Sequence, residues 1–189
     1  MGDSVSNSST SQPAIQTQQG LIHLGFLTIQ QEQGAWLGGY LVTNAWGRPL
    51  EFRLTSAIQP SRVQQILYGP TLEPHLVSEL IGRTLIEKAG VAAHVVICDH
   101  PDACFLSGKI GPAIVLMGMD APLEGFKPLE NAPNWAARLQ ASSHDLLGAQ
   151  FAASTLGVIA SPLDLLEPFN RTREAIQEAR RMGGALRAG

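Results

Sequence analysis

The first apolar run of the chain, residues 21–29, carries hydrophobic side chains on both of its alternating sets. Leu24 and Phe26 belong to one set, whereas Leu27 and Ile29 belong to the other. A strand with one wet face alternates apolar and polar residues, so this run predicts a strand that is covered on both faces. We therefore place residues 21–29 in the middle of a sheet.

Two further strands are predicted at residues 36–43 and 50–55, each after a short turn. In the second of them Leu50, Phe52 and Leu54 alternate with polar residues and are predicted to face inward. A strand with one wet face suits a position nearer the edge of the sheet. Because the connecting turns are short, the three strands are expected to form an antiparallel meander.

Helical periodicity replaces the strand pattern after this meander. Ser61 and Gln64 match a capping box at the start of a short helix, and a longer amphipathic helix follows it. Two short apolar strands, residues 95–98 and 113–117, then alternate with helical segments. Strands that alternate with helices usually pair in parallel.

The predicted fold class is therefore α/β or α+β, with a mixed sheet. An antiparallel three-stranded meander is followed by helix, strand, helix and strand, and then by C-terminal helices. The order of elements over residues 21–118 resembles the ribonuclease H-like topology. An α+β sheet of another topology is the alternative.

The chain divides into a tail and one domain. Residues 1–19 consist mainly of Ser, Thr, Gln and Asn and are predicted to be a disordered tail. Residues 20–189 are predicted to form a single α/β domain. Within it, residues 120–134 are expected to be a linker or covering loop, and residues 161–189 a C-terminal helical segment.

Composition excludes several classes of protein. Two cysteines do not make a disulfide framework, and no signal peptide or membrane span is visible, so a cytoplasmic location is expected. A net charge of −3 argues against broad nucleic-acid binding, although a local basic patch stays open. The charged fraction of 15% is low, which favours a chain that hides surface in an oligomer or complex.

Three acids are candidates for catalysis. Asp99 and Asp120 follow the two short apolar strands, and ligands of open α/β sheets bind beyond the carboxyl ends of parallel strands. With Asp102 nearby, these carboxylates could hold Mg²⁺ or Mn²⁺. The alternative is that residues 99–102 simply form a turn. The ribonuclease H-like resemblance also implies Glu79 as a helix acid, but residues 21–29 lack the first-strand acid of that family, which implies a non-catalytic relative.

The sequence offers one arrangement of possible zinc ligands. Cys98, His100 and Cys104 are spaced as C-x-H-x₃-C, with His144 as a possible fourth ligand. This spacing is not typical of a zinc site, and a cysteine that ends a core strand is usually a small buried hydrophobe. No metal and no cofactor are therefore assigned.

Two surface regions are candidates for binding. Trp46 and Arg48 lie at the predicted tip of a hairpin, and both residue types are enriched at interfaces. The alternative is that Trp46 folds over the sheet and Arg48 pairs with Glu51. Near the C-terminus, Arg173, Arg180 and Arg181 belong to a segment with a local excess of positive charge.

The sequence-based hypothesis is a non-catalytic interaction or regulatory module that acts in a complex or homo-oligomer. Its partner is expected to be a protein or a second copy of the chain, with nucleic acid as a weaker candidate and no membrane. The alternative is a divalent-metal-dependent hydrolase or nuclease that uses carboxylates at the ends of the parallel strands.

Overall fold

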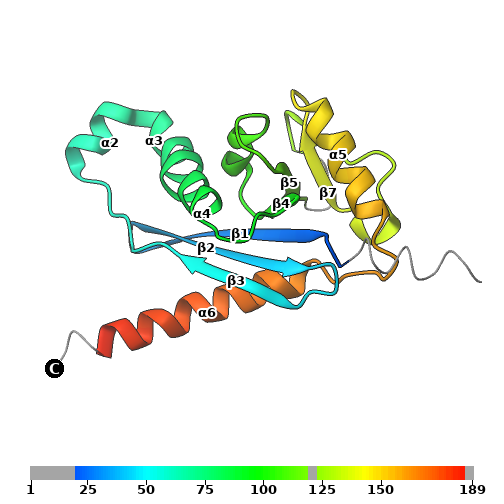
Figure 1. The fold of residues 1–189 in the computed structure, drawn as a ribbon. Helices are drawn as coiled ribbons and strands as arrows, with labels where there is room; N and C mark the ends of the chain where they lie inside the picture. The colour runs from blue at the N-terminus through cyan, green and yellow to red at the C-terminus, as the bar shows by residue number, and fades with distance from the viewer. Residues whose placement is uncertain (1–19, 119–122, 186–189) are drawn as a thin grey trace, which may run out of the picture.

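The computed structural model describes residues 20–118 and 123–185, and it places a seven-stranded sheet between helical layers (Figure 1). The order of strands across the sheet is β3-β2-β1-β4-β5-β7-β6. The strands are β1 (His23–Glu32), β2 (Ala35–Asn44), β3 (Pro49–Leu54), β4 (Val95–Cys98), β5 (Ala113–Met117), β6 (Phe126–Pro128) and β7 (Leu139–Ser142).

The sheet is mixed, as predicted. β1 pairs antiparallel with β2 and parallel with β4, and β4 pairs parallel with β5. The antiparallel meander is confirmed, and β1 lies inside the sheet with β3 at its edge. This order of the first five strands agrees with the ribonuclease H-like topology. β7 then pairs antiparallel with β5 and β6, which extends the sheet beyond that core.

One helical layer covers the face of the sheet that carries Leu27, Tyr40 and Val96. After α2 (Arg62–Tyr68), it consists of η1 (Gly69–Thr71), α3 (Leu72–Pro74), the π-helical η2 (His75–Arg83) and α4 (Thr84–Glu87). The short η3 (Pro101–Leu106) follows β4 and packs against the same layer. The predicted capping box of Ser61 and Gln64 is present at the start of α2.

A second helical layer covers the other face, which carries Leu24, Phe26 and Leu41. α5 (Leu146–Gly157) packs against β5 and β7, whereas α6 (Leu166–Ala185) packs against β1 and β2. Figure 1 shows α6 on the side of the sheet opposite α3 and α4. A short turn, η4 (Asn134–Ala136), precedes β7.

Two neighbouring glycines in β2 let both layers approach the sheet. A side chain at Gly38 would collide with Ile81 of η2, and one at Gly39 would lie 2.7 Å from atoms of Ile176 and Thr172 in α6. Because successive strand residues point to opposite faces, the pair provides one close approach on each side.

The predicted inward face of β3 is less covered than expected. Leu50, Phe52 and Leu54 are 41%, 38% and 41% exposed. The reason is that α6 contacts β1 and β2 more extensively than the edge strand β3.

The segment that was predicted as a linker contains structure. Residues 126–128 form β6, and Leu129 is buried in the core. Within the predicted C-terminal segment, residues 166–185 form the long helix α6. The predicted disordered tail lies outside the described residues. No helix in the described part of the chain is long and apolar enough to cross a bilayer.

Candidate metal site

Asp99 directly follows β4 and lies beside Thr28 and Ile29 of β1, because these two strands are parallel neighbours. Its carboxylate accepts hydrogen bonds from the Thr28 hydroxyl and, at 3.0 Å, from the backbone N–H of Ile29. Arg173 of α6 adds an ion pair at 2.8 Å, and the Asp99 side chain is only 13% exposed. The guanidinium of Arg173 thus occupies the position beside Asp99 where the sequence suggested a metal ion.

The other two predicted acids do not join Asp99 within the described residues. Glu79 pairs with Arg83 one helical turn away, at 2.7 Å. This hydrogen bond is the main reason why the pKa of Glu79 lies below its usual value. Asp120 lies outside the residues that the structure describes.

The two cysteines that were weighed as zinc ligands lie together, but His100 does not join them. The sulfur atoms of Cys98 and Cys104 lie 3.5 Å apart in the core, and both thiols are buried. The bond to Cys104 and burial raise the pKa of the Cys98 thiol. The imidazole of His100 turns away from them, since its Nε2 lies 3.3 Å from a carboxylate oxygen of Glu73.

A different cluster brings together Glu73, His100 and Asp102. One ligand atom from each side chain lies within 4.8 Å of the others, and no other such group of three occurs in residues 20–118 and 123–185. Glu73 belongs to α3, whereas His100 caps η3 and Asp102 sits in the first turn of η3. The cluster therefore joins the helical layer to the loop beyond the carboxyl end of β4.

Local hydrogen bonds orient the imidazole. The backbone N–H of Asp102 donates to Nδ1 of His100 at 3.3 Å, which assigns the ring proton to Nε2, the nitrogen that faces Glu73. The pKa of the Asp102 carboxyl is raised, chiefly by burial and also by the nearby Glu73, while His100 lowers it. A carboxyl group whose pKa is shifted by burial and by neighbouring charges is typical of functional sites.

A cavity of about 310 Å³ opens beside the cluster. Glu73 lines it together with Trp36, whose ring lies edge-on to that of His100 at a centroid distance of 6.1 Å. The rest of the lining is apolar or uncharged: Gln31, Gly34, Pro60, Gln65, Gly69, Pro70, Leu72 and Leu76.

The two surface regions that the sequence predicted for binding differ, since the hairpin tip is exposed and the C-terminal arginines are ion-paired. Trp46 is 53% exposed and Arg48 is also exposed, while Glu51 pairs with Arg53 rather than with Arg48. The three C-terminal arginines are all ion-paired: Arg173 with Asp99, Arg180 with Glu32 and Arg181 with Glu178.

Sequence reasoning missed Glu73 altogether and considered Asp102 only as a companion of Asp99. Glu73 lies 27 positions before His100, so spacing along the chain gave no sign of their contact. The usable signal was the run of residues 99–102, in which an imidazole stands between two carboxylates just after a buried strand.

No protein-family model matches the chain, and no curated protein is similar to it in sequence. Among solved structures, endonuclease V of Ciona intestinalis in complex with a 24mer DNA containing an inosine is 10% identical, with a TM-score of 0.49. That match covers 84% of this chain and 87% of the other.

A second Ciona intestinalis endonuclease V structure, a variant with a 23mer DNA, is 9% identical and has a TM-score of 0.48; it covers 89% of this chain and 96% of that one. Human ENDOV is 13% identical, with a TM-score of 0.45 and coverage of 85% and 87%. At these identities the likeness concerns the fold alone.

The expectation of a protein-interaction module differs from what these comparisons found, because the solved structures of similar fold are endonucleases, two of them with DNA bound.

Proposed function

We propose that this chain is a divalent-metal-dependent hydrolase that cuts phosphodiester bonds, with the cation held by Glu73, His100 and Asp102. The observation that carries the proposal is the grouping of three ligand atoms within 4.8 Å. Two carboxylates and an imidazole suit Mn²⁺ or Zn²⁺, whereas Mg²⁺ prefers oxygen ligands alone. Three protein ligands leave coordination positions for a water molecule and a substrate oxygen.

The location of the cluster supports catalysis. It lies just past β4, and ligands of open α/β sheets bind beyond the carboxyl ends of the parallel strands. A divalent cation bound there would lower the pKa of a coordinated water and polarise a phosphoryl oxygen. His100 can offer Nε2 to a cation only when the ring proton moves to Nδ1, and Nδ1 then gives up the hydrogen bond that it accepts from the backbone N–H of Asp102.

The neighbouring cavity supports the substrate class. Its lining includes no lysine or arginine, so the cation itself must supply the positive charge that a phosphodiester needs. Trp36, which is 7% exposed, and two prolines, Pro60 and Pro70, give the cavity an apolar wall against which a nucleobase could pack. At about 310 Å³ the cavity admits one nucleotide of a single strand rather than a duplex.

The first test is a thermal melt in EDTA, followed by addition of Mn²⁺, Zn²⁺ and Mg²⁺ in turn. A cation at a hundredfold excess over its Kd adds about 2.7 kcal/mol of stability, which raises Tm by roughly 5–10 °C in a domain of this size. His100→Gln and Asp102→Asn should each abolish the rise. Glu87→Gln is the matched control, because Glu87 is an exposed carboxylate of the same helical layer.

The second test is cleavage of an end-labelled oligonucleotide, offered as a single strand and as a duplex of the same sequence. We expect Mn²⁺-dependent cleavage of the single strand that both variants lose and the control keeps. A rise in Tm with metal that persists in both His100→Gln and Asp102→Asn would show that these two residues do not bind the cation. Metal binding without cleavage of either substrate would leave a metal site and refute the hydrolase.

The same experiments test a second placement of the cation, on Asp99 and Asp120. That placement requires Arg173 to leave Asp99, because the ion pair at 2.8 Å fills the position. If Asp99→Asn removes the metal response and Asp102→Asn does not, the second placement is correct.

A further inference from the structure

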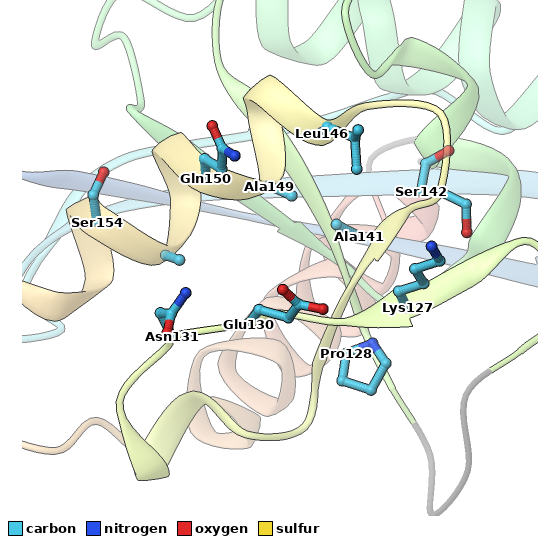
Figure 2. A pocket seen from close by; sticks show the side chains of 12 residues that line it. Lys127, Pro128, Glu130, Asn131, Ala141, Ser142, Leu146, Ala149, Gln150 and Ser154 are labelled. Atoms are coloured by element: carbon cyan, nitrogen blue, oxygen red, sulfur yellow. The ribbon is translucent and has the colours of Figure 1, made fainter.

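A larger hollow lies on the other side of the sheet, between α5 and the hairpin of β6 and β7 (Figure 2). Its volume is about 480 Å³. Ala141 and Ala153, which line it, belong to the core that faces α5 and α6. Leu72 and Leu76, which line the cavity beside Glu73, belong to the core on the opposite face. The two hollows are therefore separate sites.

Small side chains create the floor of this hollow. Ala149 and Ala153 lie four residues apart on one side of α5, and both line the space together with Ala141 of β7. Side chains of this size leave a shallow apolar surface on which a flat ring can rest.

Polar side chains surround the alanine floor at both ends of the hollow and between them. In Figure 2, Lys127 and Ser142 lie at one end, Asn131 and Ser154 lie at the other, and Glu130 lies between them. Gln150 projects from α5 above the alanines.

Most of this rim has no partner in the described part of the chain. The side chains of Lys127, Glu130, Asn131 and Gln150 make no hydrogen bond or ion pair there. The Ser142 hydroxyl accepts a bond from the backbone N–H of His144 at 3.4 Å, which leaves its own O–H free to donate. The rim therefore offers unused donors and acceptors around a preformed space.

We propose that this hollow binds a nucleoside monophosphate. The phosphate would meet the ammonium group of Lys127 and the hydroxyls of Ser142 and Ser143. The base would lie on the alanine floor and present its edge to the amides of Asn131 and Gln150. A volume of about 480 Å³ falls within the usual range for small-molecule sites.

The charges of the rim define the ligand further. Lys127 is the only lysine or arginine among the lining residues, and Glu130 opposes additional negative charge. The site therefore favours a monoester over a diphosphate or triphosphate. The Glu130 carboxylate can in turn accept a bond from an exocyclic amino group of the base. This inference does not rest on the proposed hydrolase activity.

The test is calorimetric titration of the full chain in EDTA with AMP, GMP, CMP and UMP, so that the cluster around His100 is kept free of metal. We expect at least one mononucleotide to bind with a Kd of roughly 1 mM or tighter. Lys127→Gln should weaken it by roughly ten- to hundredfold, as expected for the loss of a charge-assisted contact. Lys88→Gln, a change at an exposed lysine outside the hollow, is the matched control.

Two further variants probe the base end. Ala149→Leu fills the floor and should abolish binding, and Gln150→Ala, at an exposed position, should weaken it without affecting the fold. Inorganic phosphate and the free nucleosides are titrated separately. Phosphate that binds as tightly as the mononucleotide would reduce the hollow to a simple anion site and overturn the proposal. So would the absence of mononucleotide binding, or binding that Lys127→Gln leaves unchanged.

Discussion

At the scale of single residues, the two aspartates that flank His100 have opposite surroundings. Asp99 is held by a hydroxyl, a backbone N–H and the guanidinium of Arg173, so its charge is fully compensated. Among the described residues, none gives Asp102 a comparable set of bonds, and burial and, to a smaller extent, Glu73 raise its pKa. The first carboxylate stabilises the fold through these bonds, whereas the second keeps oxygen atoms that a cation could bind.

Arg173→Ala should destabilise the protein because it leaves the nearly buried Asp99 carboxylate without its counter-charge. We expect a loss of about 1 kcal/mol in the free energy of unfolding, measured by urea denaturation, since the arginine itself is partly exposed. Arg181→Ala removes the more exposed pair with Glu178 and serves as the comparison. Equal losses in the two variants would contradict a special role for the Asp99 contact.

We expect Glu51 to make a pH-dependent contribution to the stability of the fold. Although burial raises its pKa, bonds from the backbone N–H groups of Val91 and Gly90 and from Arg53 bring the pKa below the ordinary 4.5. A lowered folded-state pKa means that stabilisation is present above the unfolded-state pKa and is lost as pH falls through the folded-state pKa. The Tm of Glu51→Gln should therefore lie below that of the wild type at pH 7, and the gap should close on acidification. A gap that is constant down to pH 3 would show that charge is not its cause.

At the scale of elements, close approach at Gly39 fixes α6 on the sheet. Gly39→Ala would place a methyl group 2.7 Å from side-chain atoms of Thr172 and Ile176, so α6 must shift. We expect a loss of about 1–3 kcal/mol in the free energy of unfolding, the usual effect of overpacking a core. Gly157→Ala is the control, since no atom lies within 4 Å of the added carbon. Because Arg173 lies on the same helix, the shift should also weaken its contact with Asp99.

The elements also show how far the sequence could be interpreted. The apolar run of β1, the alternation of β3 and the capping box of α2 are local signals, and the three-stranded meander and the cap that they predicted were confirmed. β6 and β7 were missed because they span only three and four residues, and β6 ends in Pro128. Strands this short contain too few residues to show a periodic pattern, and they form because they pair and pack with neighbouring strands.

At the scale of the whole molecule, the candidate site depends on docking between distant parts of the chain. The sequence identified residues 99–102 as a place for chemistry, but it paired Asp99 with Asp120 and Glu79. The contact of Glu73 with His100 depends on how the helical layer packs against η3, which no spacing encodes. Likewise, the partner of Asp99 lies 74 positions away, on the last helix.

Thiol labelling should report on the unfolding of the whole domain. Cys98 is fully buried in the central sheet and Cys104 is 5% exposed, and the pKa of Cys98 is raised. Reaction with a disulfide reagent at pH 8 should therefore be slow in the native protein and rapid in concentrated guanidinium chloride. The measurement is the absorbance of the released thiolate, with Cys104→Ser to assign the two sites. Rapid native labelling would show that η3 opens locally.

The placement of α6 has a consequence for biosynthesis. α6 begins at residue 166, yet it covers the first two strands, which end at residue 44. A ribosome adding roughly 5–20 residues per second needs on the order of ten seconds to make the intervening chain. During that interval the apolar surface around Leu24, Phe26 and Leu41 lacks its native cover. The nascent chain therefore exposes an apolar face that it cannot cover until α6 has been synthesised.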